Sequence, residues 1–187
     1  MWLDRSLGSP VLGNIGMILA ELLEPFHPRL IAYDPLVPAE KARQLGVELV
    51  TLETLLDQSD FVSLHTPLTV ETRGMVNRRA LEGMKQGAFL VNLARGGLIE
   101  SLDVLLEFLQ SGKLARAALD VFEPEPPDCH HPIFAMPNVI VSPHALGMTA
   151  GPMRDIFASM ASDMAAILDG RKPQLVANPD VFSKSMG

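Results

Sequence analysis

Short apolar runs alternate with segments of helical pattern along most of this chain, and this alternation limits the possible folds more than any other feature. The apolar runs predict strands at 29–34, 47–50, 60–65, 88–92, 115–121 and 139–142. The helical patterns predict helices at 14–23, 39–45, 52–58, 77–84, 102–110 and 152–168. Strands that alternate with crossover helices pair in parallel, so the sequence predicts an α/β fold with a Rossmann-like, doubly wound parallel sheet.

The last predicted helix carries an apolar stripe at helical spacing. Its members are Met153, Ile156, Phe157, Met160, Met164 and Ile167. Such a stripe is far more often part of a core than a functional surface. We therefore expect these side chains to be buried.

Composition excludes several classes of protein. The formal net charge of -7 argues against unspecific binding of nucleic acid, and 48% hydrophobic residues argue against disorder. The single cysteine allows no internal disulfide and suits a reducing compartment. We find no apolar run near the roughly 18 residues of a membrane span and no signal-peptide pattern at the start. We expect a cytoplasmic globular protein with neither nucleic acid nor membrane as partner.

A glycine turn before the helix at 14–23 indicates a dinucleotide site. Gly13-Asn14-Ile15-Gly16 supplies the second and third glycines of the Gly-x-Gly-x-x-Gly fingerprint. Asp34 ends the next strand, near the spacing of roughly 20 residues at which an acid binds the adenosine ribose. A carboxylate there would repel a 2′-phosphate, which favours NAD over NADP.

The same site is damaged at its start. Val11 holds the place of the first glycine, although a β-branched residue does not easily adopt positive φ. The residues before it, 6–10, are a poor match for an interior strand, because Pro10 lacks an N–H for the ladder. Either these residues are a substituted first strand, or residues 2–9 precede a strand that has been deleted. The first strand is thus predicted to be degraded or missing.

Three further segments place chemically matched side chains at the predicted ends of strands. They are Asn92-Leu-Ala-Arg95-Gly-Gly, the proline-rich Asp120-Val-Phe-Glu-Pro-Glu125-Pro-Pro, and Ser142-Pro-His144-Ala. A guanidinium binds a carboxylate with two hydrogen bonds, an imidazole moves a proton near neutral pH, and a carboxylate orients that imidazole. Ligands of open parallel sheets bind at this edge, so the three are candidates for one site.

These segments resemble the NAD-dependent D-isomer-specific 2-hydroxyacid dehydrogenases, and the resemblance runs from about Gly13 to about Ala177. It implies hydride transfer between NAD(H) and a small 2-hydroxy or 2-oxo acid. Arg95 would bind the substrate carboxylate, His144 would exchange the proton, and Glu125 would hydrogen-bond and orient His144.

The resemblance also implies a set of cofactor contacts, and we expect no metal site. The residues that would contact the pyrophosphate, the adenosine ribose or the nicotinamide are Gly13, Asn14, Ile15, Gly16, Asp34, Thr66, Leu93, Ala94, Arg95, Asp120, His144 and Gly147. The run Asp128-Cys-His-His131 looks like a metal cluster, but consecutive residues rarely converge on one ion, so we interpret it as a loop.

The resemblance further implies two parts, with residues 1–172 as the NAD-binding domain and residues 173–187 as a tail left from the substrate lobe. Almost none of the family's substrate lobe precedes the first part, so we expect little or no turnover by this polypeptide alone. Two alternatives remain open, an NAD-responsive, corepressor-like interaction module and a non-catalytic truncated relic. A homodimer is the expectation from the family.

Overall fold

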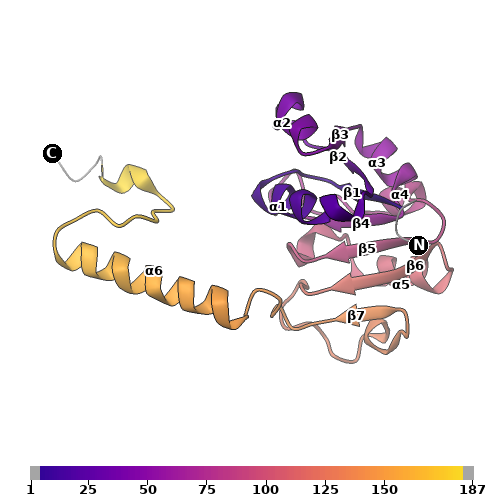
Figure 1. The fold of residues 1–187 in the computed structure, drawn as a ribbon. Coiled ribbons are helices and arrows are strands. Elements are labelled where there is room, and N and C mark those ends of the chain that lie inside the picture. Colours follow the sequence, from indigo (N-terminus) through magenta and orange to yellow (C-terminus); the bar gives the residue numbers. More distant parts are fainter. Residues whose placement is uncertain (1–4, 183–187) are drawn as a thin grey trace. The chain divides into compact units, whose positions relative to one another are not determined.

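The computed structural model describes residues 5–182 and divides into two compact units, residues 1–144 and residues 145–187. The first unit holds a seven-stranded sheet whose strands all pair in parallel, in the order β3-β2-β1-β4-β5-β6-β7 (Figure 1). The strands are β1 (Ser6–Ser9), β2 (Arg29–Ala32), β3 (Val47–Leu49), β4 (Phe61–Leu64), β5 (Ala88–Asn92), β6 (Leu114–Leu119) and β7 (Val139–Val141). The predicted α/β class is confirmed.

Helices connect successive strands. The α-helices of the first unit are α1 (Asn14–Leu23), α2 (Ala39–Gln44), α3 (Leu52–Gln58), α4 (Arg78–Gly83) and α5 (Leu102–Gln110). Short 3-10 helices add η1 (Glu24–Phe26), η2 (Gly96–Leu98) and η3 (Pro132–Ala135). Strand order reverses between β1 and β4, and in sheets of this kind the crevice at such a switch point binds ligands.

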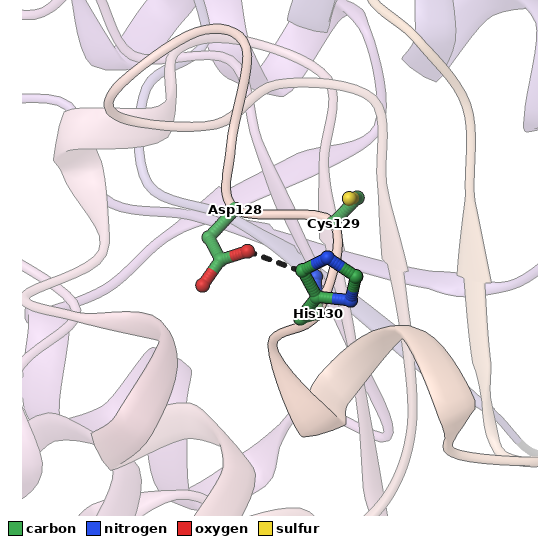
Figure 2. A group of neighbouring side chains, drawn as sticks. All are labelled: Asp128, Cys129 and His130. Carbon is green, nitrogen blue, oxygen red and sulfur yellow. Dashed lines mark hydrogen bonds between the residues drawn. The ribbon is translucent and has the colours of Figure 1, made fainter.

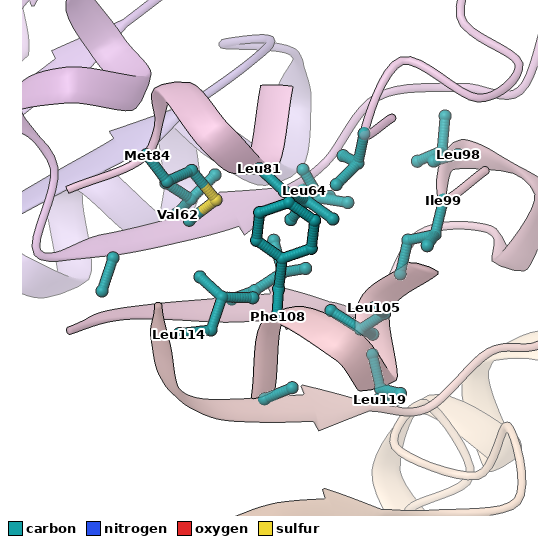
Figure 3. Close-up of a cluster of buried hydrophobic side chains, with 14 of the residues drawn as sticks. Val62, Leu64, Leu81, Met84, Leu98, Ile99, Leu105, Phe108, Leu114 and Leu119 are labelled. Atoms are coloured by element: carbon teal, nitrogen blue, oxygen red, sulfur yellow. The ribbon is translucent and has the colours of Figure 1, made fainter. Parts of the chain in front are cut away.

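Two apolar clusters cover opposite faces of the sheet. Along β2, Ile31 belongs to the larger cluster, whereas its neighbours Leu30 and Ala32 belong to the smaller one. Successive residues of a strand point to opposite faces, so the clusters lie on the two sides. The larger one packs α3, α4 and α5 on the sheet (Figure 3) and includes Val62, Leu64, Leu81, Met84, Leu98, Leu105, Phe108, Leu114 and Leu119. Helices α1 and α2 contribute to the smaller one, and the sheet is doubly wound as predicted.

Strand β1 is present, so the interpretation that it has been deleted is wrong. Residues Ser6–Ser9 pair with β2 at four positions, and Leu7 and Gly8 pair with β4 on the other side. Pro10 comes directly after the strand, so its missing N–H breaks no ladder bond within it. The strand is nevertheless short and made largely of small residues, as the substituted-strand interpretation expects.

Close packing and a buried acid hold β1 in place. A side chain at Gly8 would overlap Ser59 Oγ and come within 2.8 Å of Leu55, so glycine lets α3 approach the strand. The Asp60 carboxylate, just before β4, accepts hydrogen bonds from the Ser6 backbone N–H at 3.0 Å and from Lys85 Nζ at 2.8 Å. Polar contacts thus provide part of the stabilisation of β1 that buried apolar side chains provide in an ordinary central strand.

The second unit contains α6 (Ala150–Leu168) and the short η4 (Pro179–Phe182). The Asp163 carboxylate accepts hydrogen bonds from the backbone N–H groups of Gln174 at 2.7 Å and Leu175 at 3.2 Å. The chain after α6 therefore folds back along the helix. This division falls between His144 and Ala145, whereas the assignment of residues 1–172 to one domain remains a prediction.

The expectation of a buried stripe on α6 is not met within the second unit. Five of its members are between 47% and 63% exposed, namely Ile156, Phe157, Met160, Met164 and Ile167. An apolar stripe indicates a helix face whose burial is favourable. The pattern does not specify which surface buries it. Between residues 5 and 182, no helix combines the length and the apolar character of a membrane span.

Candidate nucleotide-binding and catalytic site

The turn between β1 and α1 has the form of a phosphate-binding turn. A Cβ at Gly16 would lie 2.9 Å from the Val11 carbonyl oxygen, so only glycine fits comfortably where the helix meets the turn. Among the described residues, no side chain caps the start of α1 and its first turn holds no acid. Asn14 and Ile15 are exposed there. Unpaired N–H groups and the positive end of the helix dipole face the space where a phosphate would bind.

Val11 adopts the backbone conformation that the missing glycine would favour. Its φ is +149°, a value that a β-branched residue adopts only with strain. The Ser9 hydroxyl donates a hydrogen bond to the Val11 carbonyl oxygen at 2.7 Å and helps hold the turn. The sequence prediction that Val11 fits poorly at this position agrees with this geometry.

Asp34 and Thr66 anchor the turn from the ends of β2 and β4, the strands on either side of β1. Asp34 Oδ2 accepts a hydrogen bond from the Leu12 backbone N–H at 2.9 Å, while Oδ1 accepts from two backbone N–H groups of its own loop. A carboxylate oxygen can accept two hydrogen bonds, which leaves Oδ2 with capacity for a ribose hydroxyl. The buried Thr66 hydroxyl donates to the Pro10 carbonyl oxygen. Both residues are predicted cofactor contacts, and that prediction did not include these anchoring bonds.

Asn92 shapes the loop that carries Arg95. Its fully buried side chain accepts a hydrogen bond from the Ala94 N–H at 3.1 Å and donates one to the Arg95 carbonyl oxygen at 3.0 Å. Leu93 and Arg95 are exposed at the carboxyl end of β5, where a ligand can reach them. The Arg95 guanidinium donates to the Ala94 carbonyl oxygen at 2.6 Å.

Two glycines bring this loop against the loop that follows β6. A Cβ at Gly96 would overlap the backbone of Phe122, and one at Gly97 would overlap the Glu123 side chain. The Phe122 N–H in turn donates a hydrogen bond to Glu125 Oε1 at 2.9 Å. The loop of Arg95 and the loop of Glu125 are therefore in direct contact.

Glu125 and His144 form a hydrogen-bonded pair. His144 Nδ1 lies 3.0 Å from Glu125 Oε2, although 19 residues separate them. The hydrogen bond to His144, with that from the Phe122 N–H, lowers the pKa of the Glu125 carboxyl below its usual value. His144 has φ of +55°, an uncommon backbone conformation that often marks functional sites. Its Nε2 remains directed away from this bond, because Nδ1 is the atom that makes it.

A comparison with known protein families then identifies the chain. The sequence profile for the D-isomer specific 2-hydroxyacid dehydrogenase, NAD binding domain, matches residues 4–145. The chain belongs to this family. NAD is the cofactor that the family's domain binds.

Relatives in this dehydrogenase family have related activities. The chain is 38% identical over 166 residues to D-3-phosphoglycerate dehydrogenase of Archaeoglobus fulgidus, an alignment that covers 89% of this chain and 31% of that protein. It is 42% identical over 156 residues to hydroxypyruvate reductase of Thermotoga maritima, covering 82% of this chain and 50% of that protein. The chain thus spans between about a third and a half of the length of these relatives.

Solved structures of the family have the same fold. The apo structure of D-lactate dehydrogenase from Escherichia coli aligns with a TM-score of 0.85 and 33% identity, covering 92% of this chain and 54% of that one. The NAD-complexed D-isomer specific 2-hydroxyacid dehydrogenase of Lactobacillus delbrueckii ssp. bulgaricus gives a TM-score of 0.84 and 30% identity, covering 92% and 56%. These matches do not favour the alternative of an NAD-responsive, corepressor-like interaction module.

The residues of the turn fit the NAD of this dehydrogenase family. The uncapped start of α1 suits a pyrophosphate, and Asp34 retains an acceptor for the ribose.

Asp120, directly after β6, is buried and accepts a hydrogen bond from the Ser142 hydroxyl at 2.5 Å. The sequence did not indicate Ser142, whose hydroxyl helps to orient this acid. Gly147 belongs to the second unit, whereas the other predicted site residues belong to the first.

In the described part of the chain, one group of side chains has metal-ligating atoms close together. These atoms, from Asp128, Cys129 and His130, all lie within 4.8 Å of one another (Figure 2). All three residues are exposed, and Asp128 Oδ1 accepts a hydrogen bond from the His130 backbone N–H at 2.9 Å. Three consecutive residues of one loop do not match the four-ligand sets of structural zinc sites. We assign this group no role.

Proposed function

We propose that this chain is the cofactor-binding part of an NAD-dependent dehydrogenase that interconverts a 2-hydroxy acid and a 2-oxo acid. The observation that carries the proposal is the bond between Glu125 and His144, which pairs a carboxylate with an imidazole on the loop side of a dinucleotide-binding sheet. The contact between the loops of Arg95 and Glu125 supports a shared site.

Each of the three side chains has a distinct task in this proposal. Bound NAD(H) would supply or accept the hydride. Arg95 would hold the substrate carboxylate with two hydrogen bonds and polarise the adjacent carbonyl group. His144 would give a proton to the developing alkoxide through Nε2, or take one from the hydroxy acid in the reverse direction.

Glu125 acts on His144 rather than on the substrate. A carboxylate beside Nδ1 favours the form in which Nδ1 carries a proton, and it restricts rotation of the ring. Because the pKa of Glu125 is lowered, this carboxyl is ionised throughout the neutral range. Glu125 is therefore a positioning residue.

The cofactor would lie along the turn and the strand ends. Gly13, Asn14, Ile15 and Gly16 would face the pyrophosphate, and Asp34 would accept hydrogen bonds from the ribose. Thr66, Leu93, Ala94 and Asp120 would line the path to the nicotinamide, with Arg95 and His144 around the reacting end.

We expect this polypeptide to bind NADH but to turn over little substrate alone. Hydride transfer needs a closed site from which water is excluded. Arg95 and the Glu125–His144 pair are exposed or half-exposed in the described structure. A measurable steady-state rate with NADH and glyoxylate, pyruvate or hydroxypyruvate would contradict this expectation.

Fluorescence titration with NADH tests the cofactor assignment. Saturable binding is expected, and Asp34→Ala should weaken it at least tenfold because the ribose loses its acceptor and the turn loses an anchor. Asp57→Ala, a change of an exposed acid on α3, is the matched control and should leave the affinity unchanged. Absence of saturable binding by the unaltered chain would refute the proposal and favour a relic.

Imidazole NMR tests the pair without requiring turnover. In the unaltered chain the His144 ring should carry its proton on Nδ1. Glu125→Ala should change the fraction of rings in this tautomer. Binding of oxamate, an analogue of pyruvate, to the NADH complex should be lost in Arg95→Ala. If Glu125→Ala leaves the tautomer of His144 unchanged, the positioning role is contradicted.

We also propose, from the family, that the chain forms a homodimer. Analytical ultracentrifugation checks this proposal.

A further inference from the structure

The loop that carries Arg95, residues 93–97, is held at both of its ends, and we call it the arginine loop. At its start, the buried Asn92 side chain donates a hydrogen bond to the Arg95 carbonyl oxygen at 3.0 Å. At its end, Gly96 and Gly97 directly follow Arg95 and pack against the loop after β6. The contacts of these two glycines therefore help to decide where the arginine lies.

An ion pair lies over Gly97. Arg73 Nη1 donates a hydrogen bond to Glu123 Oε1 at 2.6 Å, although the two residues are 50 positions apart in the chain. A Cβ at Gly97 would overlap Glu123 Oε2 and would lie 3.0 Å from Arg73 Nη1. Both charged groups thus contact the space that a side chain at Gly97 would occupy, and glycine allows the pair to close over the loop.

The ion pair connects the segments on the two sides of the arginine loop. On one side, Gly74 follows Arg73 and donates its backbone N–H to the Gly97 carbonyl oxygen at 2.8 Å. On the other side, Glu123 belongs to the loop after β6, which also carries Glu125. The bond between Arg73 and Glu123 therefore restrains the arginine loop relative to the loop of Glu125.

The space beside the arginine loop is otherwise open. A cavity of about 600 Å³ lies there, and its lining includes Gly96, Gly97, Arg73 and Glu123. Apolar packing does not fill this space, so the ion pair supplies a restraint that the core does not. The two charged side chains are 57% and 45% exposed, and an exposed ion pair contributes little to overall stability. Its effect should be local to the loop.

We propose that Arg73 and Glu123 are positioning residues, whose ion pair holds the Arg95 guanidinium in place for the substrate carboxylate. The inference rests on the proposed function, in which Arg95 binds that carboxylate. A guanidinium that forms two hydrogen bonds to a carboxylate needs a defined orientation, so a loop held more loosely binds the same anion more weakly. Neither Arg73 nor Glu123 needs to touch the substrate.

Titration of the NADH-saturated chain with oxamate, measured by calorimetry, tests the inference. Glu123→Gln removes the charge and keeps the shape of the side chain, and it should weaken oxamate about fourfold, the scale of an exposed ion pair. Arg73→Met should weaken it equally. The double variant should also lose about fourfold, because both changes remove one interaction, whereas independent effects would multiply to about sixteenfold. The NADH affinity and the urea midpoint should stay unchanged.

A second exposed ion pair provides the matched control. Arg78 Nη2 lies 2.6 Å from Glu107 Oε2, and the two side chains are 48% and 57% exposed. This pair joins α4 to α5, and neither of its residues lines the cavity beside the arginine loop. Glu107→Gln removes a charge from a pair of the same length and similar exposure, and it should leave the oxamate affinity unchanged.

Amide NMR of the free chain tests the restraint without any ligand. Glu123→Gln should shift the backbone amide signals of Arg95 and Gly97. It should also speed hydrogen exchange of the Gly74 N–H, which bonds to the Gly97 carbonyl oxygen. Glu107→Gln should do neither.

The outcomes separate this inference from the proposed function. If the unaltered NADH complex binds oxamate and Glu123→Gln binds it equally well, the inference is wrong and the proposed function stands. Multiplied losses in the double variant, an equal loss in Glu107→Gln, or unchanged Arg95 and Gly97 signals would also overturn it. If Glu123→Gln does not fold, Arg73→Met carries the same measurements. Failure of oxamate to bind the unaltered NADH complex would instead reject the proposed role of Arg95.

Discussion

Removing the charge of Asp60 should destabilise the protein in a pH-dependent way. Its carboxylate lies between the start of β1 and the loop before β5, where it accepts from the Ser6 N–H, from Lys85 Nζ at 2.8 Å and from Arg5 Nη1 at 3.3 Å. Burial of the carboxyl raises its pKa, but the hydrogen bonds from Lys85 and Ser6 outweigh this and lower the pKa from 3.8 to about 2. The native state therefore favours the ionised form.

This pKa change sets the size of the expected effect. At about 1.4 kcal/mol per pH unit, a fall from 3.8 to about 2 stabilises the folded state by about 2.5 kcal/mol. Both cationic side chains are about half exposed, and solvent screening reduces the contribution, so we expect about 2 kcal/mol. Because the folded pKa is lowered, this stability is present above about pH 4 and is lost as the pH falls toward 2.

Urea denaturation followed by circular dichroism measures the effect in Asp60→Asn. At pH 7 the variant should be about 2 kcal/mol less stable, and its difference from the unaltered chain should shrink steadily between pH 4 and pH 2. Asp57→Asn, on the exposed surface of α3, should cost under about 0.5 kcal/mol at either pH. An Asp60→Asn difference that is under 0.5 kcal/mol at pH 7, or that does not change with pH, would refute the reasoning.

Three further changes test the packing around β1 and the cofactor turn. Val11→Gly should raise the urea midpoint by an amount equivalent to about 1 kcal/mol, because glycine accepts φ of +149° without strain; a lower midpoint would contradict this. Gly8→Val should cost at least about 2 kcal/mol through overlap with Leu55 and Ser59, and a neutral effect would mean that α3 moves aside. Thr66→Val keeps the shape but removes the hydroxyl bonded to the Pro10 carbonyl oxygen, so NADH titration should find affinity reduced several-fold; equal affinity would show that this anchor is dispensable.

The sequence predicted the bounds of some helices and strands better than those of others, depending on which interactions determine where each element begins and ends. Helices α1, α3 and α5 and strand β5 have the predicted bounds, because each depends on local apolar periodicity and on neighbouring turn or capping residues. Other strands end before their predicted carboxyl-terminal residues. After β2, for example, the chain turns into a loop in which the Asp34 carboxylate accepts hydrogen bonds from the backbone N–H groups of Leu36 and Val37.

Predictions for the candidate site differ in the same way. Residue type and position at a strand end indicated His144, whereas the resemblance to the dehydrogenase family was needed to select Glu125; the structure brings the two side chains to 3.0 Å. The supporting contacts were not predictable, because Ser142 and Phe122 have no distinctive residue chemistry. Their roles come from a hydroxyl that reaches Asp120 and from a backbone N–H that reaches Glu125.

By itself, the sequence determined the α/β class, the order of strands and helices, and the residue types available for chemistry, because periodicity and turn residues act over a few neighbours. Tertiary structure decided whether β1 exists at all. Its Ser6 and Gly8 form a strand only because Asp60 and α3, more than forty residues away, supply the hydrogen bonds and the close surface that its own side chains do not. Likewise, the apolar periodicity at 152–168 predicted the helix α6. Burial of its apolar face depends on a second surface, and the unit that contains α6 leaves that face exposed.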